Sequence, residues 1–381
     1  QVNKNMFCRP VRPDLTGQDV PDDESERWRR GLYRIPIKLS DMLPVIEVQR
    51  WLLRNKVGGE RYGPNHSFGN WLQRFGKDHP DWFSYKSADK IADLMAKNPD
   101  PAALSNAFHQ TGNPCLTAPG VFEQQMADVR DHFDSQARGA KPGAAYFGTA
   151  GRFFGIVLND NYAMCQCEAC KAQYNRPVVD TPMWGGADGS VSFYLWDFVN
   201  RCARELRKTH PDKWIGQLAY STYAYYPTKV VPDKNVSVQM CLHTRNWWCP
   251  SMEANDRKVL AQWRRGSAER PLHLWLYYCF PALNAKYGNY TYWPGFFAHS
   301  VVKQMKLYHD AGIMGIFLEN SSECGATYLM DQLEYYVTFK LADDPTLDGN
   351  KLIEEFFTRY YGHAAEPMKA LYNRIEDIYT N

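Results

Sequence analysis

An acidic residue follows an apolar run near the middle of the chain. Residues 153–158 read Phe-Phe-Gly-Ile-Val-Leu and are followed directly by Asn159 and Asp160. A continuous apolar run bounded by polar residues is typical of a strand covered on both faces, and active-site groups gather at the carboxyl ends of such strands. The pattern therefore predicts Asp160 as a catalytic residue, with a turn or a helix cap as the alternative for this pair.

A second carboxylate ends another apolar run. Residues 313–318 read Ile-Met-Gly-Ile-Phe-Leu, and Glu319 follows them. Two carboxylates that flank a glycosidic bond can hydrolyse it, because one protonates the leaving oxygen and the other attacks the sugar or activates water. We therefore predict Asp160 as general acid or acid/base and Glu319 as nucleophile or base. A helix cap or salt bridge is the alternative for Glu319, and nearby Glu323 is an equal candidate for that structural role.

Polar and aromatic side chains follow the other predicted strands. Aromatic rings suit the apolar faces of sugar rings, while polar side chains can bind sugar hydroxyl groups. The predicted substrate-binding residues are His66, Asn159, Tyr220, His243, Arg245, Trp247 and Tyr277. Arg245 would also suit an anionic sugar. The two histidines are equally compatible with ordinary buried histidines, and the aromatic cluster with a carbohydrate-binding surface that does no chemistry.

Three cysteines form a compact pattern, Cys165, Cys167 and Cys170, and Cys115 ends the preceding predicted strand. Cys-x-Cys-x-x-Cys with a fourth cysteine nearby is suited to a tetrahedral zinc ion. One disulfide with a spare thiol, or reduced buried cysteines, are the alternatives. Because three or four cysteine ligands leave no open coordination position, we expect any zinc to be structural and catalysis to need no cofactor.

The elements that would position these residues alternate between strands and helices from about residue 113 onward. The predicted strands cover residues 114–117, 153–159, 214–221, 236–242, 271–278 and 313–318, with weaker candidates at 5–11 and 60–67. The predicted helices between them cover residues 121–136, 191–208, 256–265 and 293–309. Repeated βα units of this kind predict an α/β protein with a parallel sheet.

Eight such strands would close into a (β/α)8 TIM barrel over residues 1–330, with a helical C-terminal extension, residues 331–381, packed on it. Catalytic residues of such barrels lie where strands run into the following loops, which agrees with the residues named above. A doubly wound open sheet is the alternative, but no glycine-rich phosphate loop follows any predicted strand.

The composition is that of an ordinary globular enzyme. The chain has 381 residues, of which 44% are hydrophobic and 23% charged, and its net charge is +2. So small a charge favours no nucleic-acid partner, and no apolar stretch reaches the ~20 residues that cross a bilayer. We therefore expect neither nucleic acid nor a membrane as partner, and the sequence does not predict the oligomeric state.

The Asn-Asp pair and the cysteine pattern together resemble the zinc-bearing beta-galactosidase barrels. In those proteins an Asn-acid pair closes the fourth strand and a cysteine loop follows, which implies zinc at the cysteines of this chain. Asp160 stands where the galactosidases carry Glu. The side chain of Asp160 is shorter, so the resemblance does not carry over their retaining mechanism.

A longer part of the chain, from about Trp51 to Met368, resembles an uncharacterised bacterial family. This family is a domain of unknown function related to the alpha-glucuronidase and beta-hexosaminidase barrels. The matching stretches are Asn65-His-Ser-Phe, His79-Pro-Asp-Trp-Phe, Cys115-Leu-Thr, Asn159-Asp-Asn with the cysteine loop, Gly315-Ile-Phe-Leu-Glu319, and Leu333-Glu-Tyr-Tyr through Asp344-Pro to Phe356-Phe-Thr-Arg-Tyr-Tyr-Gly362. The resemblance implies a (β/α)8 barrel that acts on carbohydrate.

The same resemblance implies a bacterial protein that is exported. We therefore expect an extracellular or periplasmic location, with the signal peptide not present in this chain. Members often carry a small α/β domain before the barrel, and we expect the given residues to cover the barrel and its extension alone.

The sequence thus predicts a glycoside hydrolase that cleaves an oligo- or polysaccharide by means of a carboxylate pair. A carbohydrate-binding barrel without catalysis is one alternative, since it would keep the aromatic residues and tolerate loss of either carboxylate. A carbohydrate lyase, in which a bound metal performs the chemistry, is another. Retaining or inverting outcome would follow from the carboxylate separation, ~5 Å or ~6.5 to 9.5 Å.

Overall fold

The computed structural model describes residues 3–6, 50, 53–97, 112–144, 146–161, 163–175, 189–265, 270–278, 295–319 and 331–380. Glu323 and residues 7–11 of one predicted strand lie outside these ranges. Within the described ranges, no helix combines the length and the apolar composition that a bilayer-spanning helix needs.

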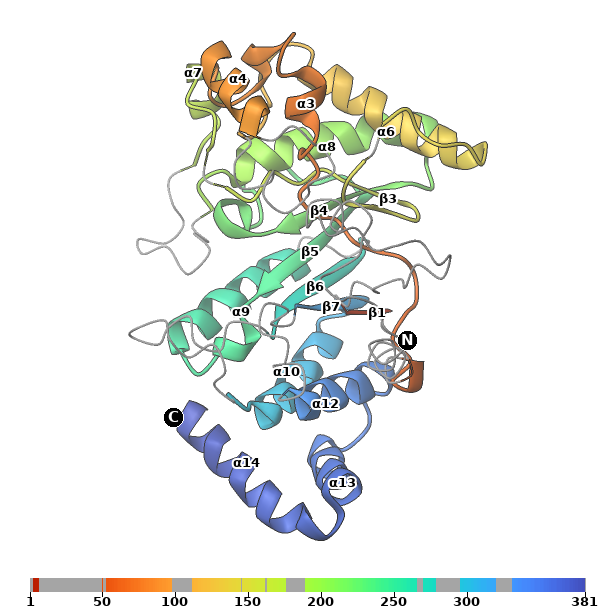
Figure 1. Ribbon diagram of the computed structural model, residues 1–381, viewed down its shortest axis with the longest axis vertical. Coiled ribbons are helices and arrows are strands. Elements are labelled where there is room, and N and C mark those ends of the chain that lie inside the picture. The colour runs from red at the N-terminus through yellow and green to blue at the C-terminus, as the bar shows by residue number, and fades with distance from the viewer. Residues whose placement is uncertain are drawn as a thin grey trace. The chain divides into compact units, whose positions relative to one another are not determined.

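The described strands form one open, mixed sheet (Figure 1). Its order is β1-β7-β6-β5-β4-β3-β2, so β1 and β2 are its two ends. The strands are β1 (Asn3–Met6), β2 (Thr149–Ala150), β3 (Phe153–Gly155), β4 (Trp214–Ala219), β5 (Val236–Leu242), β6 (Leu272–Tyr277) and β7 (Gly315–Glu319). The α/β class is confirmed, but the prediction of a closed (β/α)8 TIM barrel is wrong.

Pairing within the sheet is mostly parallel. β7 pairs in parallel with both β1 and β6, and β3 pairs in parallel with β4. The short β2 pairs with β3 in the antiparallel sense. All seven residues of β5 are buried, as expected for a strand covered on both faces.

The segment 60–67, which the sequence predicts as a strand, pairs with the sheet only at His66, opposite Val157. Its Pro64 packs over a part of the sheet that lacks side chains, and a Cβ placed on Gly216 would lie 3.1 Å from the Cβ of Pro64. Because proline has no N–H to donate, the segment cannot continue a ladder of hydrogen bonds.

The predicted strand 114–117 is also reduced to a single bridge. Pro114 pairs in the antiparallel sense with Phe83, outside the parallel part of the sheet. The chain then turns at once, because the N–H of Ala118 donates to the carbonyl oxygen of Cys115. These two missing strands are the reason that the described strands do not make eight parallel members.

The chain divides into two compact units. The first contains the described parts of residues 1–8, 49–60 and 240–381, and the second those of residues 9–48 and 61–239. β1, β6 and β7 belong to the first unit, and β2, β3 and β4 to the second, while β5 continues from the second into the first.

The helices of the second unit are α3 (Trp71–Phe75), α4 (Ala88–Lys97), α6 (Val121–Ala137), α7 (Glu168–Lys171) and α8 (Ser192–Thr209). α8 packs against both β4 and α6. Its buried stripe repeats at spacings of three and four residues, at Leu195, Val199, Cys202 and Leu206. Arg74 of α3 binds Asp128 of α6 with two hydrogen bonds of 2.6 Å each, which joins these two helices.

The helices of the first unit are α9 (Pro250–Arg265), α10 (Ala298–Asp310), α12 (Gln332–Asp343), α13 (Gly349–Tyr361) and α14 (Ala365–Thr380). α12 packs against α10 and α13, and α13 packs against α14 (Figure 1). Asp348 caps α13 by accepting hydrogen bonds from the N–H groups of Asn350 and Lys351. The region that the sequence predicts as a helical extension thus forms α12, α13 and α14.

Glu376 of α14 caps the start of α10. Its carboxylate accepts hydrogen bonds from the backbone N–H of His299, at 2.9 Å, and from the ring Nδ1 of His299, at 2.8 Å. The hydrogen bond to Glu376 raises the pKa of His299 above its ordinary value. A protonated His299 therefore stabilises the contact between these two helices.

We expect the stability contributed by His299 to fall as the pH rises. Because the folded-state pKa lies above the unfolded value, the contribution is fully present below the unfolded value and is lost as the pH passes through the folded one. The side chain is half-exposed, so we expect about 0.5 kcal/mol. Urea unfolding of wild type and His299→Gln at pH 5.5 and pH 8 measures it. An equal dependence on pH in both proteins would contradict the prediction.

Candidate functional site

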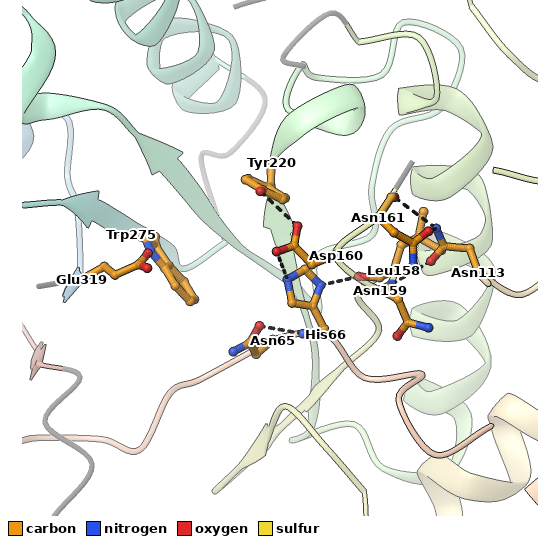
Figure 2. A network of polar contacts seen from close by, with 10 residues as sticks. All are labelled: Asn65, His66, Asn113, Leu158, Asn159, Asp160, Asn161, Tyr220, Trp275 and Glu319. Carbon is orange, nitrogen blue, oxygen red and sulfur yellow. Dashed lines mark hydrogen bonds and ion pairs between the residues drawn. The ribbon is translucent and has the colours of Figure 1, made fainter. Parts of the chain in front are cut away.

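Asp160 lies in the loop after β3, and two other predicted site residues from other segments contact its side chain (Figure 2). The Tyr220 hydroxyl, which follows β4, donates a hydrogen bond of 3.2 Å to Asp160 Oδ1. Nε2 of His66 lies 3.9 Å from Asp160 Oδ2. The Asp160 side chain is 37% exposed, so its carboxylate contacts these two residues and still reaches solvent. The second unit thus brings Asp160, His66 and Tyr220 together.

His66 owes its position to the bridge between its segment and the β3 segment. Next to that bridge, the N–H of Ser67 donates to the carbonyl oxygen of Val157 at 2.9 Å. The ring Nδ1 of His66 lies 2.5 Å from the carbonyl oxygen of Leu158, and the ring packs edge-on against Tyr220. His66 therefore contacts both the backbone before Asp160 and the Asp160 side chain.

Asn113 holds the two residues that flank Asp160. Its Oδ1 accepts a 2.7 Å hydrogen bond from the N–H of Asn159, and its Nδ2 donates to Asn161 Oδ1 at 3.1 Å (Figure 2). Asn113 is fully buried, and Asn159 is buried as well. One carboxamide thus fixes the acid loop on both sides of Asp160.

Asn113 was not predicted as a site residue. The sequence gives only a weak indication of its role, namely that this asparagine stands two residues before Cys115 in the segment Asn-Pro-Cys. The backbone hydrogen bond of Asn159 places that residue against Asn113, and its predicted contact with a sugar stays a prediction.

Glu319, the second predicted carboxylate, is the last residue of β7 and belongs to the first unit. Its Oε2 accepts a 2.7 Å hydrogen bond from the indole N–H of Trp275 on β6 (Figure 2). In the register of these strands Tyr277 lies opposite Glu319, so Trp275 is a diagonal neighbour on the same face. The indole N–H stabilises the ionised form of this carboxylate.

Two predicted sugar-binding residues of the first unit, His243 and Trp247, contact one buried acid, and a third, Tyr277, contacts His243. Asp256 of α9 accepts hydrogen bonds from the N–H of His243, at 2.6 Å, and from the indole of Trp247, at 2.8 Å. His243 Nδ1 lies 3.2 Å from the same carboxylate, and the His243 ring stacks on Tyr277 with centroids 5.3 Å apart.

Asp256 was predicted only as the first residue of a helix. The helix begins earlier, at Pro250, which places Asp256 on its buried face three residues before Val259 and four before Leu260. An acidic residue at such a position was the signal that could have identified it, because a buried charge needs donors to satisfy it.

Arg245 lies inside the first unit, with a side chain that is 1% exposed. Its Nε donates to the carbonyl oxygen of Tyr278 at 2.8 Å, and its Nη1 to that of Gly295 at 2.7 Å. Its Nη2 donates to the carboxylate of Asp331, the residue just before α12. All three guanidinium nitrogens therefore bind groups of the chain itself, and the predicted contact of Arg245 with a substrate stays a prediction.

The four cysteines form one cluster in the second unit. The Sγ atoms of Cys115, Cys165, Cys167 and Cys170 all lie within 4.8 Å of one another, and none of the four forms a disulfide. Sγ of Cys115 is 3.9 Å from that of Cys167 and 3.6 Å from that of Cys170. The prediction that Cys115 joins the cysteine loop is confirmed.

The sequence model of one protein family, described as a domain of unknown function, DUF4838, matches residues 42–373. The chain belongs to this family. The match covers Asp160, Glu319 and all four clustered cysteines of this DUF4838 chain. No curated protein and no solved structure matches the chain.

The cysteine cluster of this DUF4838 chain fits a metal ion. Four sulfurs at the corners of a tetrahedron around zinc, with bonds of ~2.3 Å, would lie about 3.8 Å apart, close to the separations from Cys115. Hydrogen bonds from Cys165 and Cys170 hold the pKa of Cys115 well below its ordinary range and favour a thiolate there, while the same contacts with Cys115 raise the pKa of Cys165 and Cys170. The four residues could therefore hold a metal ion.

A cation stands beside this cluster. Burial acts to lower the pKa of Lys86, but the neighbouring thiols, Cys115 foremost, raise it above its ordinary value. The backbone of Lys86 has φ of 48°, an uncommon conformation for a residue with a side chain. Its charge would offset part of the negative charge of metal-bound thiolates in the DUF4838 chain.

Proposed function

We propose that the chain is a glycoside hydrolase that cleaves a glycosidic bond in an oligo- or polysaccharide. The observation that carries this proposal is the Asp160 carboxylate, which is contacted by the Tyr220 hydroxyl and the His66 ring and yet remains partly exposed. A carboxyl group in such surroundings can exchange a proton with a bound ligand. The resemblance to carbohydrate-acting families supports a sugar as that ligand.

In this proposal Asp160 acts as general acid or acid/base. Its carboxyl group gives a proton to the leaving oxygen, and the hydrogen bond from Tyr220 stabilises the carboxylate that forms. Glu319 acts as nucleophile or base, and the Trp275 N–H favours the ionised form that this role needs. The stacked rings of His243 and Tyr277 would contact the sugar.

We further propose that the cysteine cluster holds zinc as a structural ion. Cys115, Cys165, Cys167 and Cys170 would supply four thiolates and leave no coordination position for a substrate. The bound ion would tie the segment after Asn113 to the loop after Asp160, and the chemistry would be left to the carboxylates.

The test is release of reducing sugar from a broad panel of polysaccharides and aryl glycosides. Wild type should release sugar, and Asp160→Asn and Glu319→Gln should not, at unchanged thermal unfolding temperature. Asp93→Asn is the matched control, because Asp93 is 56% exposed and pairs with Lys97 within α4. Binding of glycans by all proteins with no release by any would favour a carbohydrate-binding protein, and release of unsaturated sugars would favour a lyase.

A further inference from the structure

The contact between His66 and Leu158 determines which ring nitrogen of His66 carries a hydrogen. Nδ1 lies 2.5 Å from the carbonyl oxygen of Leu158. A carbonyl oxygen can only accept, so Nδ1 must be the donor and carries its hydrogen in every charge state of the ring. In the neutral ring, Nε2 then holds a lone pair.

That Nε2 atom faces Asp160 Oδ2 at 3.9 Å (Figure 2). An ionised carboxylate oxygen also only accepts, so neutral His66 and ionised Asp160 would present two lone pairs to each other. One added proton removes this conflict, either on Nε2, which gives an ion pair, or on the carboxyl group, which then turns an O–H toward the Nε2 lone pair. The geometry therefore favours a state in which the two side chains carry one proton between them.

We propose that His66 and Asp160 share this proton and that the pair, rather than Asp160 alone, is the acid of the reaction. The catalytic role rests on the proposed function, whereas the shared proton is a property of the protein without substrate. His66 thereby changes from a residue that binds a sugar hydroxyl to one that holds the transferred proton.

The surroundings keep the pair in place. The His66 side chain is only 14% exposed, and its backbone N–H donates to Asn65 Oδ1 at 2.7 Å. Tyr220, a titratable group that contacts the pair, donates to Asp160 Oδ1 and so leaves Oδ2 turned to His66. The Asn113 carboxamide fixes the backbone on both sides of Asp160.

The proton balance of the step is simple. The glycosidic C–O bond breaks, its electron pair stays with the leaving oxygen, and that oxygen takes the proton of the pair from the Asp160 carboxyl group. Asp160 is then ionised and His66 is neutral with Nδ1–H. Water supplies the hydroxyl group to the sugar carbon, and its remaining proton is taken up by the base and finally restores the pair.

Nitrogen-15 NMR of histidine-labelled protein across pH tests the pair without any substrate. The His66 signals are assigned by their loss in His66→Gln. We expect the neutral ring to be the Nδ1–H tautomer in wild type. We also expect the titration midpoint of the His66 ring to fall by about one pH unit in Asp160→Asn, because an opposite charge within ~4–6 Å favours the protonated ring and partial exposure weakens the effect. Asp93→Asn should leave the midpoint unchanged.

An Nε2–H tautomer in the neutral ring, or an equal midpoint in wild type and Asp160→Asn, would overturn the proposal. Activity separates it from the proposed function. If a substrate from the panel is hydrolysed, the alkaline decline of kcat/KM should follow the His66 midpoint in wild type and move to lower pH in His66→Gln, where the Asp160 carboxyl group has no partner ring to share the proton with. If His66 and Asp160 are coupled but the protein hydrolyses no substrate, the proposed hydrolase function is wrong and the shared proton is supported. If the protein hydrolyses a substrate but His66 is not coupled to Asp160, the hydrolase function is supported and the shared proton is wrong.

Discussion

Asp160→Asn should lower kcat by about 10²–10⁴-fold, the range that general acid catalysis contributes. The asparagine side chain has nearly the same shape and can still accept the Tyr220 hydrogen bond on Oδ1, but an amide does not give up a proton to a leaving oxygen. Asn113 binds Asn159 and Asn161 and not Asp160, so the substitution leaves the hydrogen bonds that hold this loop unchanged. KM should therefore change little.

The measurement is kcat and KM on two aryl glycosides that differ in the acidity of the leaving phenol. A more acidic phenol leaves with less protonation, so the loss in Asp160→Asn should shrink on that substrate. Tyr220→Phe keeps the carboxyl group and should cost much less. A uniform loss on both substrates, or none, would show that Asp160 is not the proton donor.

Arg245→Met should lower the free energy of unfolding by about 3–5 kcal/mol, as expected when one partner is removed from a buried ion pair. The guanidinium binds Asp331 and the carbonyl oxygens of Tyr278 and Gly295, and methionine leaves all three without this donor. Asp331 is buried, so water cannot readily replace the lost hydrogen bonds.

Glu334 is a second buried carboxylate close to Asp331. It is fully buried in α12 and accepts a hydrogen bond from the N–H of Phe297 on Oε1, while its Oε2 accepts none from the described residues. Burial, followed by the nearby charge of Asp331, raises the pKa of Glu334 to about 8. One arginine thus neutralises one carboxylate, and the second stays protonated near neutral pH.

Urea unfolding at pH 7 measures the effect of Arg245→Met. Arg359→Met is the matched control, because Arg359 is 79% exposed and pairs only within α13, with Glu355, among the contacts of the described residues. It should change stability by less than about 0.5 kcal/mol. A loss in Arg245→Met no larger than that of the control would mean that the buried pair contributes nothing beyond its packing.

The strands were predicted best where burial is continuous. β4, β5 and β6 lie within predicted ranges, and β7 extends one residue beyond its range, to Glu319. β5 is buried along its whole length, so a simple apolar run identified it. Pro64 and Pro114 explain the two failures, because each interrupts the hydrogen bonds that a parallel strand would need. Closure of a sheet into a barrel depends on the pairing of all its strands, so it cannot be predicted from the sequence pattern of any one of them.

The part of the candidate site that was predicted correctly consists of cysteines that lie close together in the sequence. The loop cysteines lie within six residues of one another, and the addition of Cys115 followed from the order of the strands. Asn113 and Asp256 were missed because each acts by accepting hydrogen bonds from backbone groups that only folding brings near. The sequence shows only that these two residues are polar, and polarity alone does not predict such a role.

Asn113 and Cys115 stand on the same short segment, with one residue between them. A larger thiophilic ion in the cysteine cluster would need longer bonds, and Cys115 would move outward with it. Asn113 would follow, since only Pro114 separates the two, and would pull on the backbone at Asn159 and Asn161. The titration midpoint of His66 would change with that displacement. The radius of the bound ion would therefore affect Asp160, a carboxylate that does not coordinate the ion.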